Sequence, residues 1–140
     1  MAVLNKGVVE RGTFISGTAL DAVTATTTSS AIPIAGAKKI TWFFTRANHS
    51  SGSTAFDVDV SLDGTTFIDF NMLIQNLARD AGAGTAGEDI GTTAVASVTL
   101  SSNTTETYSM DLNDFGFTQM KVTATETTDG THSASFLIEY

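Results

Sequence analysis

Residues 54–70, with the sequence TAFDVDVSLDGTTFIDF, decide the fold of this chain. Apolar and polar side chains alternate from residue 56 to residue 62, which is the pattern of a strand that buries one face. The apolar members are Phe56, Val58, Val60 and Leu62. Asp63 and Gly64 then predict a tight turn, because Asp hydrogen-bonds nearby backbone and Gly accepts a positive φ. Residues 65–70 are rich in β-branched and aromatic side chains, so we expect them to return as the second strand of a hairpin.

A second strong strand pattern covers residues 38–46, KKITWFFTR. Ile40, Trp42 and Phe44 share one face, which we expect to be buried. Phe43 is an aromatic residue on the opposite, nominally polar face. We therefore expect Phe43 to lie under a second layer or at a subunit contact.

The last third of the chain alternates again, in segments separated by turn residues. We expect residues 95–100 to pair with residues 104–112 across a turn at 101–103. Residues 117–127 and 131–140 also alternate, and Asp129 with Gly130 predicts a second hairpin turn between them. Residues 113–116 predict a further turn, between the segments 104–112 and 117–127.

Other segments are less regular. Gly17 predicts a turn or bulge within one or two short strands over residues 13–30, and Pro33 favours an edge strand over residues 31–36. Residues 71–80 fit either a short helical turn or a strand-to-loop connection. Short strands with turn signals at roughly 8–12-residue spacing are typical of sandwiches and barrels. We predict an all-β fold, an antiparallel β-sandwich of jelly-roll or Ig-like type with about eight strands.

Length and composition limit the function. A chain of 140 residues corresponds to one domain, which we place at residues 13–140, with residues 1–12 as an extended N-terminal arm or an edge strand. The net charge of −8 repels phosphate backbones, so we expect no nucleic acid partner. No apolar run is long enough for a transmembrane helix, and the first residues lack a signal-peptide pattern, so we expect synthesis in the cytoplasm and no membrane partner.

The sequence offers few candidates for chemistry. His49 and His132 both lie among polar residues, so we expect each to be a solvated surface side chain. There is no Cys, no GxSxG nucleophile motif, and the Gly-rich segment 81–91 lacks a phosphate-binding pattern, which favours a surface or subunit-contacting loop. We therefore predict a non-enzyme with no catalytic residue and no cofactor.

Four carboxylates in the hairpin raise the question of a Ca²⁺ site. They are Asp57, Asp59, Asp63 and Asp69. Ca²⁺ prefers carboxylate oxygens, but the ligand spacing of a calcium-binding loop is absent. We expect a solvated acidic face and no metal site.

Two segments carry a resemblance to a known family. Residues 40–70, ITWFFTRANHSSGSTAFDVDVSLDGTTFIDF, and residues 117–140, FTQMKVTATETTDGTHSASFLIEY, resemble small virion structural proteins of tailed bacteriophages. The resemblance covers about half of the chain and implies a head decoration (cement) protein. Such a protein is a β-sandwich, often trimeric, that binds the major capsid protein on the outside of the virion.

The resemblance also implies that the N-terminal arm clasps shell subunits. Partner-binding residues are then expected in the arm, together with Phe43. In the arm they are Val3, Leu4, Lys6, Val8, Val9 and Arg11. The alternative is a glycan-binding β-sandwich of a phage tail or fibre, and a third interpretation is a hydrolase on a jelly-roll frame.

Overall fold

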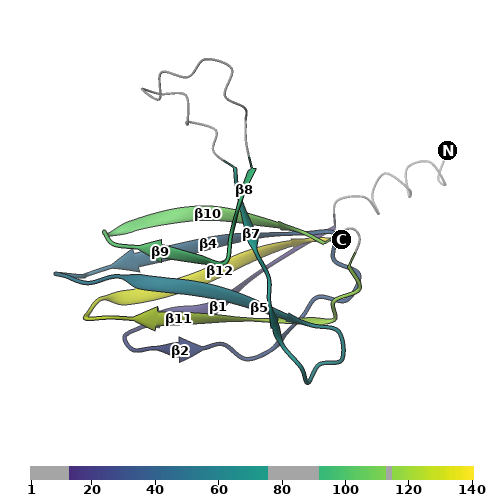
Figure 1. Ribbon diagram of the computed structural model, residues 1–140, viewed down its shortest axis with the longest axis horizontal. Coiled ribbons are helices and arrows are strands. Elements are labelled where there is room, and N and C mark those ends of the chain that lie inside the picture. The colour runs from purple at the N-terminus through teal and green to yellow at the C-terminus, as the bar shows by residue number, and fades with distance from the viewer. Residues whose placement is uncertain (1–12, 76–91, 113–114) are drawn as a thin grey trace, which may run out of the picture.

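The alternating segments form strands throughout residues 13–75, 92–112 and 115–140, which are the residues that the computed structural model describes. The strands make two antiparallel sheets that pack face to face (Figure 1). The first sheet contains, in spatial order, β1 (Phe14–Val23), β12 (Thr131–Glu139), β4 (Lys39–Ala47), β10 (Thr104–Asp111), β7 (Met72–Gln75) and β8 (Thr92–Val95). The second contains β2 (Thr27–Thr28), β11 (Gln119–Glu126), β5 (Thr54–Ser61) and β6 (Ile68–Asp69), with β3 (Ile32–Pro33) paired to β11 and β9 (Ser97–Leu100) paired to β5.

The predicted all-β sandwich is confirmed, with more strands in the described residues than the eight expected. Several strands are shorter than predicted, since β2, β3 and β6 have two residues each. Pro33 lies in β3, on the margin of the second sheet, as its missing N–H predicts. Met72 to Gln75 form a strand, so the helical alternative fails for these residues.

The core lies between the two sheets and is dominated by aromatic side chains. Trp42 and Phe44 of β4 are fully buried and stack with ring centroids 5.6 Å apart. Phe44 also stacks on Phe56 of β5, at 4.6 Å, and this contact joins one sheet to the other. The indole Nε1 of Trp42 donates to the Met110 sulfur at 3.1 Å, which gives the buried N–H a partner. The alternation of β4 and β5 is therefore realised as predicted.

The predicted pairing of residues 95–100 with residues 104–112 is wrong. β9 pairs with β5, while β10 pairs with β4 and β7, so the segments on either side of residues 101–103 belong to different sheets. The predicted strand 95–100 is broken at Ala96, where the chain passes from β8 in one sheet to β9 in the other. Period-2 alternation determines which face a strand buries, but it does not select the partner strand.

The second Asp-Gly turn also differs from its prediction. β11 pairs with β5 and β12 pairs with β1 and β4, so residues 127–130 connect opposite sheets instead of closing a hairpin. Gly130 has φ 111°, and an added Cβ would stand 3.1 Å from the Ala47 carbonyl oxygen. The glycine is needed for this conformation, as the turn chemistry indicated, although it serves a crossing between layers.

Gly17 serves close packing within β1. It lies opposite Phe136 of β12, and a Cβ at this position would stand 2.5 Å from the tip of the Phe136 ring. The register shift predicted near Gly17 follows it, between Thr18 and Leu20. Residues 1–12 and 81–91, to which an arm and a loop were assigned, lie outside the described residues.

Candidate partner-binding surface

The loop between β5 and β6 is the first component of the surface. The Asp63 carboxylate accepts the backbone N–H groups of Thr65 at 2.8 Å and Thr66 at 2.7 Å, and Gly64 adopts φ 77°. These bonds hold the pKa of Asp63 down at about 2, with the Thr66 N–H contributing most and the Ser61 hydroxyl adding to it. The predicted turn is present, but it occupies residues 62–67, so the return strand begins only at Ile68.

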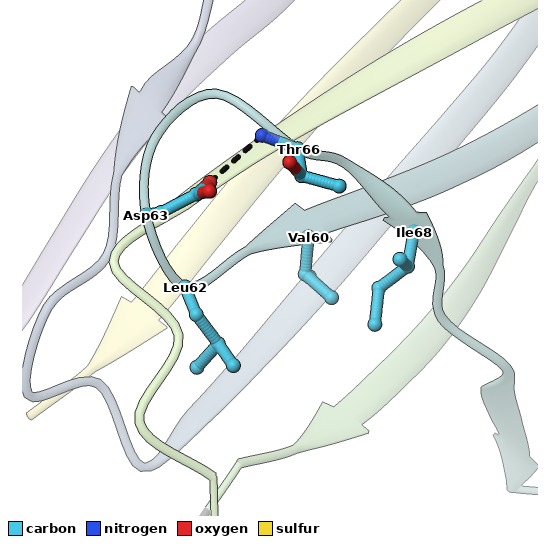
Figure 2. Close-up of a pocket in the computed structure, with 5 residues that line it drawn as sticks. All are labelled: Val60, Leu62, Asp63, Thr66 and Ile68. Carbon is cyan, nitrogen blue, oxygen red and sulfur yellow. Dashed lines mark hydrogen bonds between the residues drawn. The ribbon is translucent and has the colours of Figure 1, made fainter.

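The longer loop leaves apolar side chains uncovered. Leu62, predicted to be buried, lies beyond the end of β5 and is 62% exposed. Ile68 lies directly opposite the buried Val60, so both occupy the core face of the second sheet, yet Ile68 is 53% exposed. Figure 2 shows Val60, Leu62 and Ile68 pointing into the same space, a hollow of about 320 Å³ that Asp63 and Thr66 also line.

An aromatic cluster stands beside β6. Phe115 is 53% exposed and stacks on Phe117 with ring centroids 5.3 Å apart. Phe70, which directly follows β6, meets both rings edge-on at 5.8 Å. We call this set the apolar corner: Leu62, Ile68, Phe70, Phe115 and Phe117. Large apolar side chains exposed close together on a soluble protein mark a surface for a partner.

Sequence reasoning missed the apolar corner. It assigned Leu62 to the buried face and treated Phe115 as part of a turn over residues 113–116. A signal was available, because each of these large apolar residues lies beside turn residues, where a strand face no longer covers it. Turn segments are normally polar, so an apolar side chain within one indicates a contact made elsewhere.

The outer face of the same hairpin carries the acidic row, which we define as Asp57, Asp59 and Asp69. Asp59 lies opposite Asp69 on one side and Lys121 on the other. Partial burial raises the pKa of Asp59, and the hydrogen bond and charge of Asp69 raise it further, against the opposing effect of Lys121. Burial and the Asp69 charge likewise raise the pKa of Asp57. The row therefore carries an excess of negative charge that Lys121 offsets only in part.

The expected absence of a calcium site remains an expectation. Asp63 turns its carboxylate into the loop instead of toward the acidic row. Across the part of the chain that the structure describes, no group of three or more His, Asp or Glu side chains is arranged to hold a metal ion.

Phe43 lies on the outer face of the first sheet. Its neighbours in register are Ser135 on β12 and Thr107 on β10, and its side chain is 37% exposed. The described residues place no second layer over it, so within them that alternative has no support. The subunit-contact alternative stays a prediction, and the other predicted contact residues, Val3 to Arg11, lie outside the described residues.

At the opposite end of the sandwich, polar side chains are buried. Arg46 is fully buried, and its guanidinium donates to the carbonyl oxygens of Ser51, Gly52 and Asp129 at 2.6, 2.9 and 3.0 Å. Its Nη2 also lies 3.8 Å from the Asp129 carboxylate. The Asp129 carboxylate in turn accepts the Ser50 hydroxyl and the Ser50 and Ser51 N–H groups. The Arg46 side chain therefore links the connections 48–53 and 127–130 by hydrogen bonds.

His132 contradicts its prediction as a solvated residue, because it is fully buried beside Arg46. Its Nε2 lies 2.9 Å from the Glu126 carboxylate and its Nδ1 lies 2.8 Å from the Thr54 hydroxyl. Since a carboxylate only accepts, Nε2 donates, and in the neutral ring Nδ1 accepts the hydroxyl proton. His49 is partly exposed and its ring contacts the Asn103 side chain.

Thr54, His132 and Glu126 follow the order of a hydroxyl–imidazole–carboxylate triad. Thr54 and His132 are both 0% exposed, so no substrate reaches the hydroxyl. We define the polar end as Arg46, Thr54, Glu126, Asp129 and His132 and assign it a structural role.

Searches with the sequence give no identification: no family model matches the chain, and no curated protein matches it. The fold is similar to the crystal structure of the SPBc2 prophage-derived protein YomS, with a TM-score of 0.64 at 10% identity, over 92% of this chain and 95% of that one. The two proteins share the sandwich fold.

Weaker structural likenesses involve much longer chains. The infectious bursal disease virus structures of the Gx and Gt strains give TM-scores of 0.42 and 0.40, at 11% and 14% identity. These likenesses cover 91% and 92% of this chain but only 32% and 33% of the viral chains. Scores this low do not establish a shared fold. No helix in the described part of the chain is long and apolar enough to span a membrane.

Proposed function

We propose that this protein is a head decoration protein of a tailed bacteriophage, which binds the major capsid protein on the outside of the shell and stabilises it. The observation that carries the proposal is the apolar corner, where Leu62, Ile68 and Phe115 are each more than half exposed. The protein leaves these side chains in water although it buries a complete aromatic core, which indicates a partner that covers them. The mechanism is mass action: contacts made only in the assembled shell stabilise it over free subunits.

Two further observations support the proposal. The segments 40–70 and 117–140 resemble small tailed-phage virion proteins, and the fold is that of a prophage-derived protein. The triad-like arrangement at the polar end is closed to substrate, which favours a structural protein over the hydrolase alternative.

No observation favours the glycan-binding alternative. Sugar-binding platforms expose Trp and Tyr. Here Trp42 and Tyr108 are buried, Tyr140 is half-buried, and the exposed large aromatic side chains of the described residues are phenylalanines: Phe14, Phe43 and Phe115.

Co-sedimentation with phage heads that lack decoration protein tests the proposal. The full-length protein is expected to sediment with the heads and to raise the temperature at which they lose their DNA. Deletion of residues 1–11 and the variant Phe43→Ser each test a predicted contact, with circular dichroism confirming that the variant is folded. Failure of the folded full-length protein to bind heads at any ratio contradicts the function.

Light scattering of the protein alone tests the predicted trimer. Three chains of 14.6 kDa give the expected mass, and a monomer would restrict trimer formation to the shell lattice.

A further inference from the structure

We propose that the free edge of β6, with the hollow and the acidic row on its two sides, binds an extended segment of the shell protein in which apolar residues alternate with Lys or Arg. The inference deepens the proposed function by naming a docking surface and the chemistry of its partner, and it rests on that function for the partner's identity. Three features of the hairpin support it: an unpaired backbone edge, two chemically different faces and an excess of negative charge.

The backbone of β6 is available on one side. β6 pairs with β5, and no other strand of the described residues lies beyond it. Phe70 donates its N–H to the Val58 carbonyl oxygen at 3.0 Å, so in this antiparallel register the Asp69 N–H and C=O point away from β5. An extended peptide can add to such an edge through main-chain hydrogen bonds.

The two faces of this edge differ in chemistry. Ile68 lies on the side of the hollow, together with Val60 and Leu62 (Figure 2). Asp69 lies on the other side, opposite Asp59. A peptide strand that pairs with β6 alternates its own side chains between the same two sides. The hollow therefore takes one apolar side chain, and the residues next to it in the peptide meet the acidic row.

Charge determines which polar residues fit. The acidic row places three carboxylates against the single ammonium group of Lys121, which also lies over the Phe67 ring at 4.2 Å from its centroid. Lys or Arg at the alternate peptide positions would offset the mutual repulsion of these carboxylates. Glu or Asp at those positions would add to it.

Peptide titrations of the full-length protein, followed by ¹⁵N NMR, test the proposal. The probe is an N-acetylated, C-amidated heptapeptide of alternating Lys and Val. Two control peptides are a block-ordered heptapeptide of the same composition and an alternating peptide of Glu and Val. The alternating Lys peptide is expected to bind at least roughly fivefold more tightly than the block peptide, with the largest shifts at Thr66 to Phe70. The Glu peptide is expected not to bind.

Matched variants separate the two faces. Ile68→Ser and Asp69→Lys are each expected to weaken binding of the alternating Lys peptide by roughly fivefold. Ile15→Ser and Asp21→Lys change an exposed apolar and an exposed acidic residue of β1 in the first sheet, so they are expected to leave binding within about twofold. Asp69→Lys places an ammonium group opposite Asp59, so we expect the variant to keep its fold, which circular dichroism checks.

Equal binding of the alternating and block peptides, or shifts confined to residues outside the hairpin, would overturn the inference. So would unchanged binding by both hairpin variants. The proposed function can be tested separately from this inference. If Ile68→Ser still binds heads and Phe43→Ser does not, the shell contact lies on the first sheet and not on the hairpin. Failure of the wild-type protein to bind heads, while the alternating Lys peptide still binds the hairpin, would support the peptide site and contradict the decoration role.

Discussion

One end of the sandwich buries polar side chains, and the other end exposes apolar side chains. At the polar end, Arg46 and His132 are fully buried among hydrogen-bond acceptors and donors. At the apolar corner, Leu62 and Ile68 are more than half exposed. A buried polar group destabilises the fold unless it has hydrogen-bond partners. The side chains of the polar end must therefore hold fixed positions relative to one another. An exposed apolar group costs the isolated fold little, and it stabilises a complex when a partner covers it.

This difference indicates which part of the molecule maintains the fold and which part meets a partner. The polar end ties two connections between sheets through Arg46, so changes there should appear in the free energy of unfolding. At the apolar corner, Leu62, Ile68 and Phe115 are more than half exposed, so changes to these three residues should appear in binding. Variants at the two ends therefore test the comparison directly.

The largest effect on stability is expected from Arg46→Met. The substitution removes three donors to the carbonyl oxygens of Ser51, Gly52 and Asp129 and leaves these acceptors without a partner. We expect the free energy of unfolding, measured by urea denaturation, to fall by about 3 kcal/mol. Arg46→Lys keeps the charge but loses the planar fork, so it should recover only part of the loss. A change below about 0.5 kcal/mol would contradict the structural role of the polar end.

A smaller loss is expected from His132→Leu, which leaves the Thr54 hydroxyl and the Glu126 carboxylate without their partner. We expect a loss of about 2 kcal/mol in the same measurement. Thr54→Val removes the hydroxyl that bonds the His132 Nδ1, so it breaks one of the two hydrogen bonds that His132→Leu also breaks. The double variant should therefore lose less than the sum of the two single variants, by about 1 kcal/mol. Strict additivity would mean that the two side chains do not interact.

The alternation in the sequence indicates that Arg46 and His132 are buried, but it does not indicate their hydrogen-bond partners. His132 has the same parity as Ala134, Phe136 and Ile138, and all four side chains point inward. Arg46 likewise continues the inward set of β4. Period 2 therefore indicates burial at both positions, whereas residue polarity led to the wrong prediction for His132. The partners that satisfy the two side chains lie in the connections 48–53 and 127–130 and on other strands, at Thr54 and Glu126, and alternation does not identify them.

At the apolar corner the error is reversed, because Leu62 was predicted to be buried and is exposed. The alternation of β5 predicted that Leu62 faces the core, but the strand ends at Ser61, whose hydroxyl bonds the Asp63 carboxylate and the Gly64 N–H. The bounds of β4, β5, β10, β11 and β12 were predicted to within two residues, but β1 has ten residues where only one or two short strands were expected over residues 13–30. The partner strand of each segment was not predicted, because alternation carries no information on pairing between sheets.

The acidic row offers a test by pH. The pKa of Asp59 is raised above its ordinary value in the folded state, so its charge destabilises the fold above that pKa. The destabilisation is relieved as the pH falls through the raised pKa toward about 3.8. Asp69→Asn removes a like charge directly opposite Asp59, and we expect it to raise stability by about 0.5 kcal/mol at pH 7. The gain should vanish as the pH approaches 4.

Asp63 supplies an internal contrast for that titration. Its pKa of about 2 lies below the ordinary value, so its contribution to stability is present above pH 3.8 and is lost as the pH falls toward 2. Asp21→Asn changes an exposed acid on β1 and is the control for Asp69→Asn. An identical pH profile for the two variants would mean that the acidic row is no different from an isolated surface carboxylate.

The smallest effect on stability is expected at the apolar corner, from a pair of residues that face each other in register. Val60 is 0% exposed and Ile68 is 53% exposed, although they occupy the same face of adjacent strands. Val60→Ala should cost about 2 kcal/mol in unfolding free energy, because it opens a cavity in the core. Ile68→Ala should cost no more than about 0.5 kcal/mol, because water already covers much of the side chain.

Binding should reverse this order. Ile68→Ala removes an apolar surface that a partner would cover, so it should weaken co-sedimentation with undecorated heads although the protein remains as stable as the wild type. Val122→Ala changes a fully buried core residue of β11 that does not line the hollow, so this variant, tested below its unfolding temperature, should bind nearly as well as the wild type. If Ile68→Ala instead destabilised the fold as much as Val60→Ala does, the side chain would belong to the core, and the apolar corner would lose its separate role.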